Sequence, residues 1–115
     1  MEKFILLFRM DILTPETQPT SEQMASYMAD WYSWIESIEA NGKLAPGGNH
    51  LSREGRIVLS DQTITESPYA VKNDSVAGYI LILANDFEDA VSIAKECPIL
   101  NGTGNSVEVR RIASA

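Results

Sequence analysis

Two stretches of the chain are apolar at nearly every position, a pattern typical of strands that are buried on both faces of a sheet. Stretch 77–84 is one of them, and alternation along it puts its apolar side chains on two faces, with Tyr79, Leu81 and Leu83 on one and Ile80, Ile82 and Ala84 on the other. Stretch 3–10 has the same pattern, interrupted only by Arg9. We therefore predict two central strands, each of which needs cover on both sides.

Two stretches have helical periodicity instead. The first starts at Thr20 or Ser21, where Thr20 and Gln23 fit a capping box, and it ends at Asn41-Gly42. Its apolar stripe has helical spacing and is interpreted as a core face, although its aromatic members could also form a ligand box; the stripe is Met24, Tyr27, Met28, Trp31, Trp34, Ile35 and Ile38.

The second helix is predicted over 87–97, with Asn85 or Asp86 as its cap and Pro98 as its stop. Its expected buried stripe is Phe87, Ala90, Val91, Ala94 and Cys97.

The remaining segments are shorter. Residues 11–20 are predicted to form a loop, a candidate flap, and 43–51 an extended segment broken by a turn. A hairpin is expected from 56–60 and 63–66 around Asp61-Gln62, then an irregular or short helical link over 70–76. Stretch 106–112 has the alternation of an edge strand.

This order predicts one α+β domain over residues 1–115, a ferredoxin-like βαββαβ arrangement with an inserted hairpin. In that topology the two strands that are apolar on both faces lie in the middle of the sheet. Helices can cover only one face, so we expect the other to be covered by the sheet of a second copy, in a homodimer that forms a dimeric α+β barrel.

Charge and composition exclude several classes of partner. The net charge is -7 and the nine Lys and Arg residues are spread along the chain, so no nucleic-acid surface is expected. A single cysteine, Cys97, and a single histidine, His50, give no basis for a metal site, and no cofactor is predicted. No signal peptide or transmembrane stretch is recognised, so we expect a cytoplasmic protein without membrane contact.

Any imidazole acid or base in this chain must be His50. Asp61 and Glu66 are the nearest downstream carboxylates that a hairpin could bring back to it, and we take His50 and Asp61 as the candidate catalytic pair. The alternative is a loop histidine that packs on a turn or faces solvent.

Arg9 is the second candidate, because it interrupts an apolar strand face. It could bind an acidic ligand through two hydrogen bonds, or pair with Glu108 or another carboxylate. Around 66–79, the side chains of Glu66, Tyr69, Lys72 and Tyr79 could line the same cleft, although Tyr79 could equally belong to the core and Tyr69 could plug the sheet edge.

The chain resembles the YCII-related proteins and, within them, the DGPF-domain branch. The signature segment Glu66-Ser67-Pro68-Tyr69 occupies the place of Asp-Gly-Pro-Phe. The other segments that carry the resemblance are Phe4 to Arg9, Gly42-Lys43-Leu44, Gly47-Gly48-Asn49-His50-Leu51, Gly78-Tyr79, Cys97-Pro98-Ile99-Leu100 and Ser106 to Arg110. The departures fall in the signature, where Glu66 and Ser67 replace aspartate and glycine, Val71 stands where an acidic residue is common, and Asn73 where lysine is common. A site that uses those positions in relatives is altered here.

The resemblance implies a dimeric α+β barrel. Related proteins carry a His and Asp pair proposed as enzyme-like, some members of the wider superfamily degrade aromatic compounds, and the DGPF branch is associated with extracytoplasmic-function sigma factors. Two functions are therefore kept open: binding of a small organic ligand beside the sheet with proton transfer through His50, or a non-catalytic binding or regulatory module.

Overall fold

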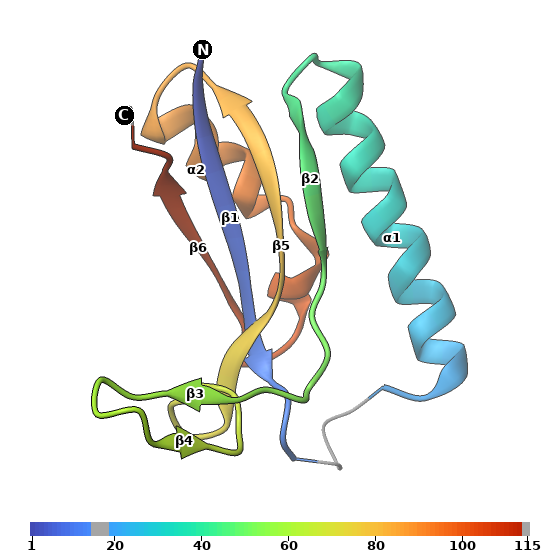
Figure 1. Ribbon diagram of the computed structural model, residues 1–115. Coiled ribbons are helices and arrows are strands. Elements are labelled where there is room, and N and C mark those ends of the chain that lie inside the picture. The colour runs from blue at the N-terminus through green and yellow to red at the C-terminus, as the bar shows by residue number, and fades with distance from the viewer. Residues whose placement is uncertain (15–18, 114–115) are drawn as a thin grey trace.

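The structure, a computed structural model, describes residues 1–14 and 19–113. The predicted flap at 11–20 therefore lies partly outside the described residues. Along the chain come β1 (Glu2–Asp11), α1 (Ser21–Ala40), β2 (Leu44–His50), β3 (Ile57–Val58), β4 (Ile64–Thr65), β5 (Asp74–Ala84), α2 (Phe87–Lys95), the 3-10 helix η2 (Pro98–Asn101) and β6 (Ser106–Arg111) (Figure 1).

The main sheet has four antiparallel strands in the order β2-β5-β1-β6, while β3 and β4 form a separate ribbon. This is the predicted ferredoxin-like α+β arrangement with an inserted hairpin, and it is confirmed. The two strands that are apolar on both faces, β1 and β5, occupy the centre as expected.

Strand β5 is longer than predicted, because it starts at Asp74 rather than at Ala77. Past a bulge between Phe8 and Arg9, the last residues of β1 continue to pair with this extension, Arg9 with Val76 and Asp11 with Asp74. The irregular link expected over 70–76 was therefore wrong for its last three residues. Residues 74–76 are polar or mixed in character, so their sequence does not indicate a strand. They form one because they pair with the end of β1.

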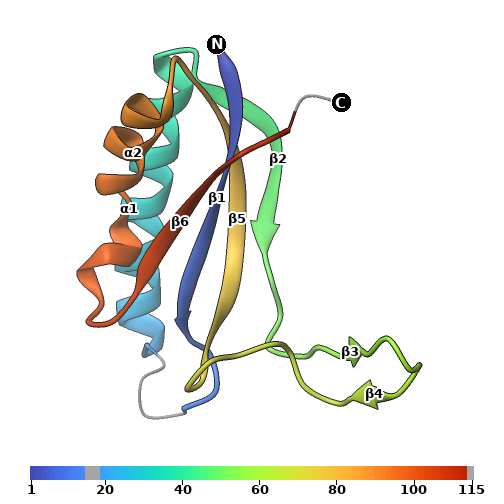
Figure 2. The same ribbon diagram turned by 90° about the vertical axis from the view of Figure 1, so that its left-hand side faces the viewer.

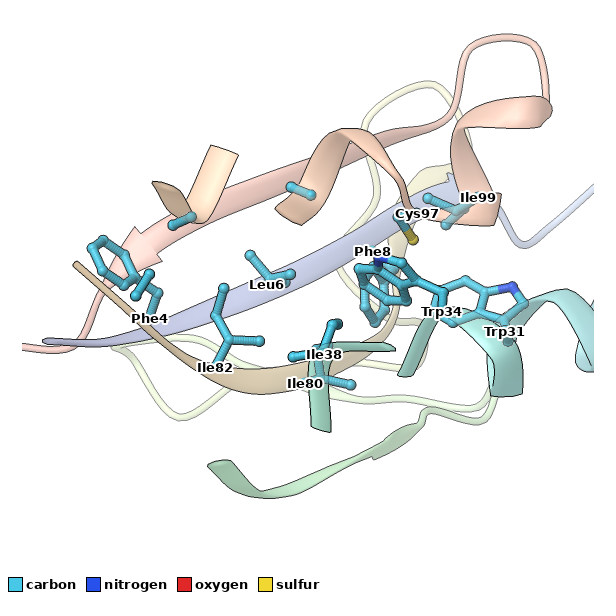
Figure 3. Close-up of a cluster of buried hydrophobic side chains, with 13 residues drawn as sticks. Phe4, Leu6, Phe8, Trp31, Trp34, Ile38, Ile80, Ile82, Cys97 and Ile99 are labelled. Carbon is cyan, nitrogen blue, oxygen red and sulfur yellow. The ribbon is translucent and has the colours of Figure 1, made fainter. Parts of the chain in front are cut away.

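The core lies between the sheet and the two helices (Figure 3). Phe8 is at its centre, with its ring centroid 4.7 Å from that of Trp31 and 6.0 Å from that of Trp34, both edge-on. The aromatic stripe of α1 is thus core, as interpreted. The other buried members labelled in the figure are Phe4, Leu6, Ile38, Ile80, Ile82, Cys97 and Ile99.

Helix α1 begins as its sequence predicts. The Gln23 backbone N–H donates to Thr20 Oγ1 at 3.1 Å and the Thr20 N–H donates to Gln23 Oε1 at 2.9 Å, which completes the capping box. One member of the predicted stripe was wrong, since Met24 in the first turns is 42% exposed.

The buried stripe of α2 was partly wrong. Asp86 caps the helix as predicted, but Phe87 and Val91 are 41% and 37% exposed, and the buried positions are Ala90 and Ala94. Small side chains let the helix lie close to the sheet, which leaves the larger neighbours at the rim. The helix also ends at Lys95, so Cys97 is buried from the following turn instead.

Both helices cover the same face of the sheet, and no described element covers the other (Figure 2). We call the uncovered side the open face. The register places on it alternate residues of β1, β5 and β6, half-buried apolar side chains among them; its members are Lys3, Ile5, Leu7, Arg9, Tyr79, Leu81, Leu83, Glu108 and Arg110. That a second copy covers this face stays a prediction.

The inserted hairpin leaves the sheet at one end and projects away from the helices, on the side of the open face (Figure 2). We call residues 55–68 the arm. Its two ends meet at Gly55, where a Cβ would lie 2.9 Å from Pro68 Cβ, so only glycine fits this approach. Its tip closes at Gln62, which has φ 76°, with the Leu59 N–H donating to Thr63 O at 2.8 Å.

No helix within the described ranges combines the length and the apolar character needed to cross a membrane.

Candidate functional site

A cleft of about 490 Å³ lies in the corner between the sheet and the base of the arm. Its volume falls within the range of small-molecule sites, about 300–1,000 Å³. The sheet contributes Arg9, Ser75 and Val76, while the segments that lead into and out of the arm contribute Leu51, Ser52, Glu54, Pro68 and Tyr69. A second depression, between α1 and α2, is smaller at about 220 Å³ and includes Trp34 and Ile93 in its lining.

Arg9 is the cation of the cleft. Its Nε and Nη2 donate to Glu108 Oε1 at 3.1 and 2.9 Å, and the two side chains are 33% and 35% exposed. The hydrogen bond from Arg9 is the main reason that the pKa of Glu108 is lowered, with the charges of Arg9 and Arg110 adding to it. Arg9 Nη1 has no hydrogen-bond partner among the described residues, so both of its N–H donors remain for a ligand.

One wall of the cleft is fixed by Ser75. This buried serine donates its hydroxyl to the carbonyl oxygen of Tyr69, which ties the segment after the arm to the start of β5. The Tyr69 side chain is 72% exposed in the single chain. Tyr69 and Arg9 both line the cleft, so the lining includes an aromatic ring, a hydroxyl and a guanidinium.

A tight turn, 71–74, carries Lys72 away from this wall. The N–H and carbonyl groups of Val71 and Asp74 bond reciprocally at 2.9 and 3.0 Å, and Lys72 and Asn73 between them have φ 52° and 68°. Two left-handed residues are typical of a type I′ hairpin turn. Lys72 stands exposed at the tip and does not line the cleft.

His50 and Asp61 are not paired in the structure. Asp61 lies at the tip of the arm, where its Oδ1 accepts hydrogen bonds from the Thr63 N–H at 3.0 Å and the Thr63 hydroxyl at 2.6 Å; these bonds lower its pKa. The His50 imidazole is exposed and forms no ion pair or hydrogen bond with a carboxylate of the described residues.

The register also separates His50 from Arg9. His50 is opposite Gly78, which is opposite Phe8, so His50 belongs to the face that the helices cover, whereas Arg9 belongs to the open face. Glu66 is exposed on the arm, and Tyr79 is half-buried on the open face opposite Leu7. Neither lines the cleft.

Of the seven side chains predicted for the site, the cleft therefore brings together Arg9 and Tyr69. Sequence reasoning did not assign the other lining residues to the site; these are Leu51, Ser52, Glu54, Pro68, Ser75 and Val76. Arg9 lies opposite Val76 because of the bulge between Phe8 and Arg9, and no local sequence pattern predicts this bulge. Glu54 and Ser52 follow the family-like segment at 47–51, and that proximity was the one available signal.

The described residues offer neither a reactive thiol nor a metal-binding cluster. Burial raises the pKa of the Cys97 thiol to about 12, so at neutral pH it is a core side chain rather than a nucleophile. The described residues contain no group of three or more His, Cys, Asp or Glu side chains able to hold a metal ion.

An antiparallel sheet in ferredoxin-like order, with both helices on one face, defines a two-layer α+β protein. The chain belongs to the YCII-related family, since the model of the YCII-related domain matches residues 9–113. No curated protein matches the chain.

Proposed function

We propose that this protein is a twofold homodimer that binds a small organic acid in the cleft beside Arg9. The observation that carries the proposal is the position of the Arg9 guanidinium, in a cleft whose other walls are mostly apolar or uncharged. Apolar walls with a few placed polar groups are typical of small-molecule sites.

The charge of the cleft selects the ligand. The chain as a whole is at -7, which repels anions, so an anion needs a local cation, and Arg9 provides one with Nη1 free to donate. Glu54 lines the same cleft and disfavours a second negative charge. A monocarboxylate fits these two conditions better than a dicarboxylate or a phosphate.

The walls select the body of the ligand. Leu51, Pro68 and Val76 offer apolar contacts, and Tyr69 adds an aromatic ring. A compact aromatic or branched aliphatic acid would bury its apolar part against them while its carboxylate faces Arg9.

The dimer is supported by the open face. Its half-buried apolar side chains, among them Leu7, Tyr79 and Leu81, form a sheet surface that no described element shields. An exposed apolar surface of this kind marks an interface, and a twofold axis would pair two such faces.

The alternative function, a non-catalytic binding or regulatory module, has the same fold and the same proposed dimer as an enzyme would. The two differ in whether a bound ligand is converted to a product. His50 lies on the opposite face of the sheet from Arg9, so its proposed proton transfer would act outside the cleft. Conversion of a bound acid that is lost in His50→Ala would assign an enzyme. Binding without conversion, unchanged in that variant, is what the positions of Arg9 and His50 lead us to expect.

The test is a thermal-shift screen with a panel of aromatic and aliphatic monocarboxylates, run on the wild type and on Arg9→Lys. Lysine keeps the charge but cannot repeat the forked geometry, so we expect a positive shift in the wild type that falls by more than half in the variant. Arg110→Lys is the matched control, because Arg110 pairs with the same Glu108 at 3.5 Å but does not line the cleft. Equal shifts in all three proteins, or none in any, would contradict the proposal.

A further inference from the structure

The arm exposes an unusual amount of apolar side chain for a free hairpin. Val58 is 65% exposed, Leu59 47% and Ile64 61%, and Val58 and Ile64 face each other across the ribbon. Paired residues on one side of a ribbon form a continuous apolar strip. Such a strip in water is a contact surface that lacks its partner.

The arm also has little internal support. Its strands β3 and β4 are two residues each, and they pair only with one another. A lone two-stranded hairpin is at best marginally stable in water. The close approach of Gly55 to Pro68 fixes where the arm leaves the protein, and the rest of its length needs another surface to hold it.

The whole protomer has more surface than its mass accounts for. It exposes 7812 Å², whereas a compact monomer of 12.7 kDa is expected to expose about 6,200 Å². Its radius of gyration is 15.4 Å, against about 13 Å for a compact chain of this length. The excess of about 1,600 Å² is twice the 800 Å² or so that a partner contributes to a standard interface.

The arm and the open face form two sides of one corner (Figure 2). The arm projects from the end of the sheet, on the side opposite the helices, so anything seated on the open face also meets the arm. In a twofold dimer the relation is mutual, since each open face receives a partner whose own arm extends back along the first copy. The cleft lies at the inside of this corner, where the arm joins the sheet.

We propose that the arm is a clasp between subunits: its apolar strip, Val58 and Ile64, packs against a second copy of the chain seated on the open face, and that copy closes the cleft of the first. The proposal rests on the homodimer inferred above and adds to it the contact that the arm makes and the completion of the cleft. We assign the partner as a second copy because each copy carries the same open face and the same arm. A single twofold contact therefore covers both apolar strips and both open faces.

The test compares dimer dissociation constants, measured by sedimentation, for the wild type and three variants. Val58→Ser with Ile64→Ser removes the apolar strip, and we expect the dissociation constant to rise at least tenfold. Leu81→Arg places a charge in the middle of the open face and should give a monomer. Val91→Ser is the matched control, an exposed valine on α2, and should leave the constant unchanged.

The outcomes separate the two levels of the inference. A wild-type dimer that Leu81→Arg dissociates, but whose constant the arm substitutions leave unchanged, would overturn the clasp while the dimer stands. A wild-type monomer would overturn both. Because Val58 and Ile64 are both exposed in the protomer, the arm variant is expected to fold. Amide exchange gives a second measure, with protection of the Leu59 and Thr65 amides expected to rise with protein concentration in the wild type only.

Closure of the cleft is tested by labelling. The thiol of Ser52→Cys lines the cleft, and we expect it to react with a disulfide reagent at least fivefold more slowly in the dimer than in the Leu81→Arg background. Ser33→Cys, exposed on α1, is the control and should react equally fast in both. The native Cys97 is buried and adds little background. Equal rates for Ser52→Cys in both backgrounds would show that the partner leaves the cleft open.

Discussion

Arg9 and Glu108 meet on the open face as neighbours across β1 and β6, although 99 positions separate them in the chain. The strand pattern predicted that Arg9 would interrupt an apolar face, and pairing with Glu108 was one of its two expected roles. That pairing is confirmed, and it does not remove the other role, because Nη1 faces no partner among the described residues.

The pair should leave a signature in the pH dependence of stability. The pKa of Glu108 is lowered in the folded protein from its ordinary 4.5, so the pair stabilises the fold above about pH 4.5 and this contribution disappears as the pH falls through the folded pKa. We expect Glu108→Gln to be less stable than the wild type at pH 7 by about 1 kcal/mol or less, as for exposed pairs, and the gap to close towards pH 3.

Urea unfolding at pH 7, 5, 4 and 3 measures this gap. Glu36→Gln is the control, since Glu36 is exposed on α1 and makes no ion pair among the described residues. A gap for Glu108→Gln that stays constant down to pH 3 would show that the carboxylate charge contributes nothing to stability.

At the scale of the element, β1 has two different faces of similar composition. Leu6 is fully buried beneath the helices, whereas its neighbour Leu7 is half-buried on the open face. Sequence periodicity cannot tell these faces apart, because both are apolar. Their difference comes from which layer each one meets.

Alanine substitutions at Leu6 and Leu7 should separate the two faces. Leu6→Ala leaves a cavity in the core, and we expect a loss of about 2–5 kcal/mol in the free energy of unfolding at every protein concentration. Leu7→Ala should weaken the dimer instead, so its loss should be greatest at low concentration. Denaturant unfolding at 1 and 100 μM measures both. Identical concentration dependence in the two variants would argue against the open face as an interface.

On the scale of the whole molecule, the protomer is a plate, 42 × 42 × 21 Å, with helices on one side only. The homodimer that we propose would cover this bare apolar face with the sheet of a second copy. Mass action then couples stability to concentration.

The dimer predicts a melting temperature that depends on concentration. A hundredfold increase adds about 2.7 kcal/mol per dimer, which corresponds to a rise of about 5–10 °C for a unit of this size. Scanning calorimetry or intrinsic fluorescence between 1 and 100 μM measures it, and Trp31 and Trp34 in the core are suitable reporters. The same melting temperature across this range would mean that the protomer unfolds alone.

Features encoded by neighbouring residues were predicted correctly from the sequence, whereas features that depend on contacts between distant elements were not. The central strands, α1 with its capping box, the hairpin and the edge strand β6 were predicted because each is encoded by spacing within some twenty residues. Phe87, Val91 and the start of β5 were misjudged, because their burial or pairing depends on how closely another element approaches. The cleft falls in the second group, since it joins Arg9 to residues 51–54, 68–69 and 75–76.

The sequence by itself determined the order of the elements and the identity of the two central strands, because periodicity and capping act between near neighbours. Only the tertiary structure decided that Arg9 shares a cleft with Tyr69 and lies on the opposite face of the sheet from His50. A bulge of one residue in the β1–β5 register places Arg9 opposite Val76 rather than Ala77, and a register is fixed by the packing of whole strands rather than by any one of them.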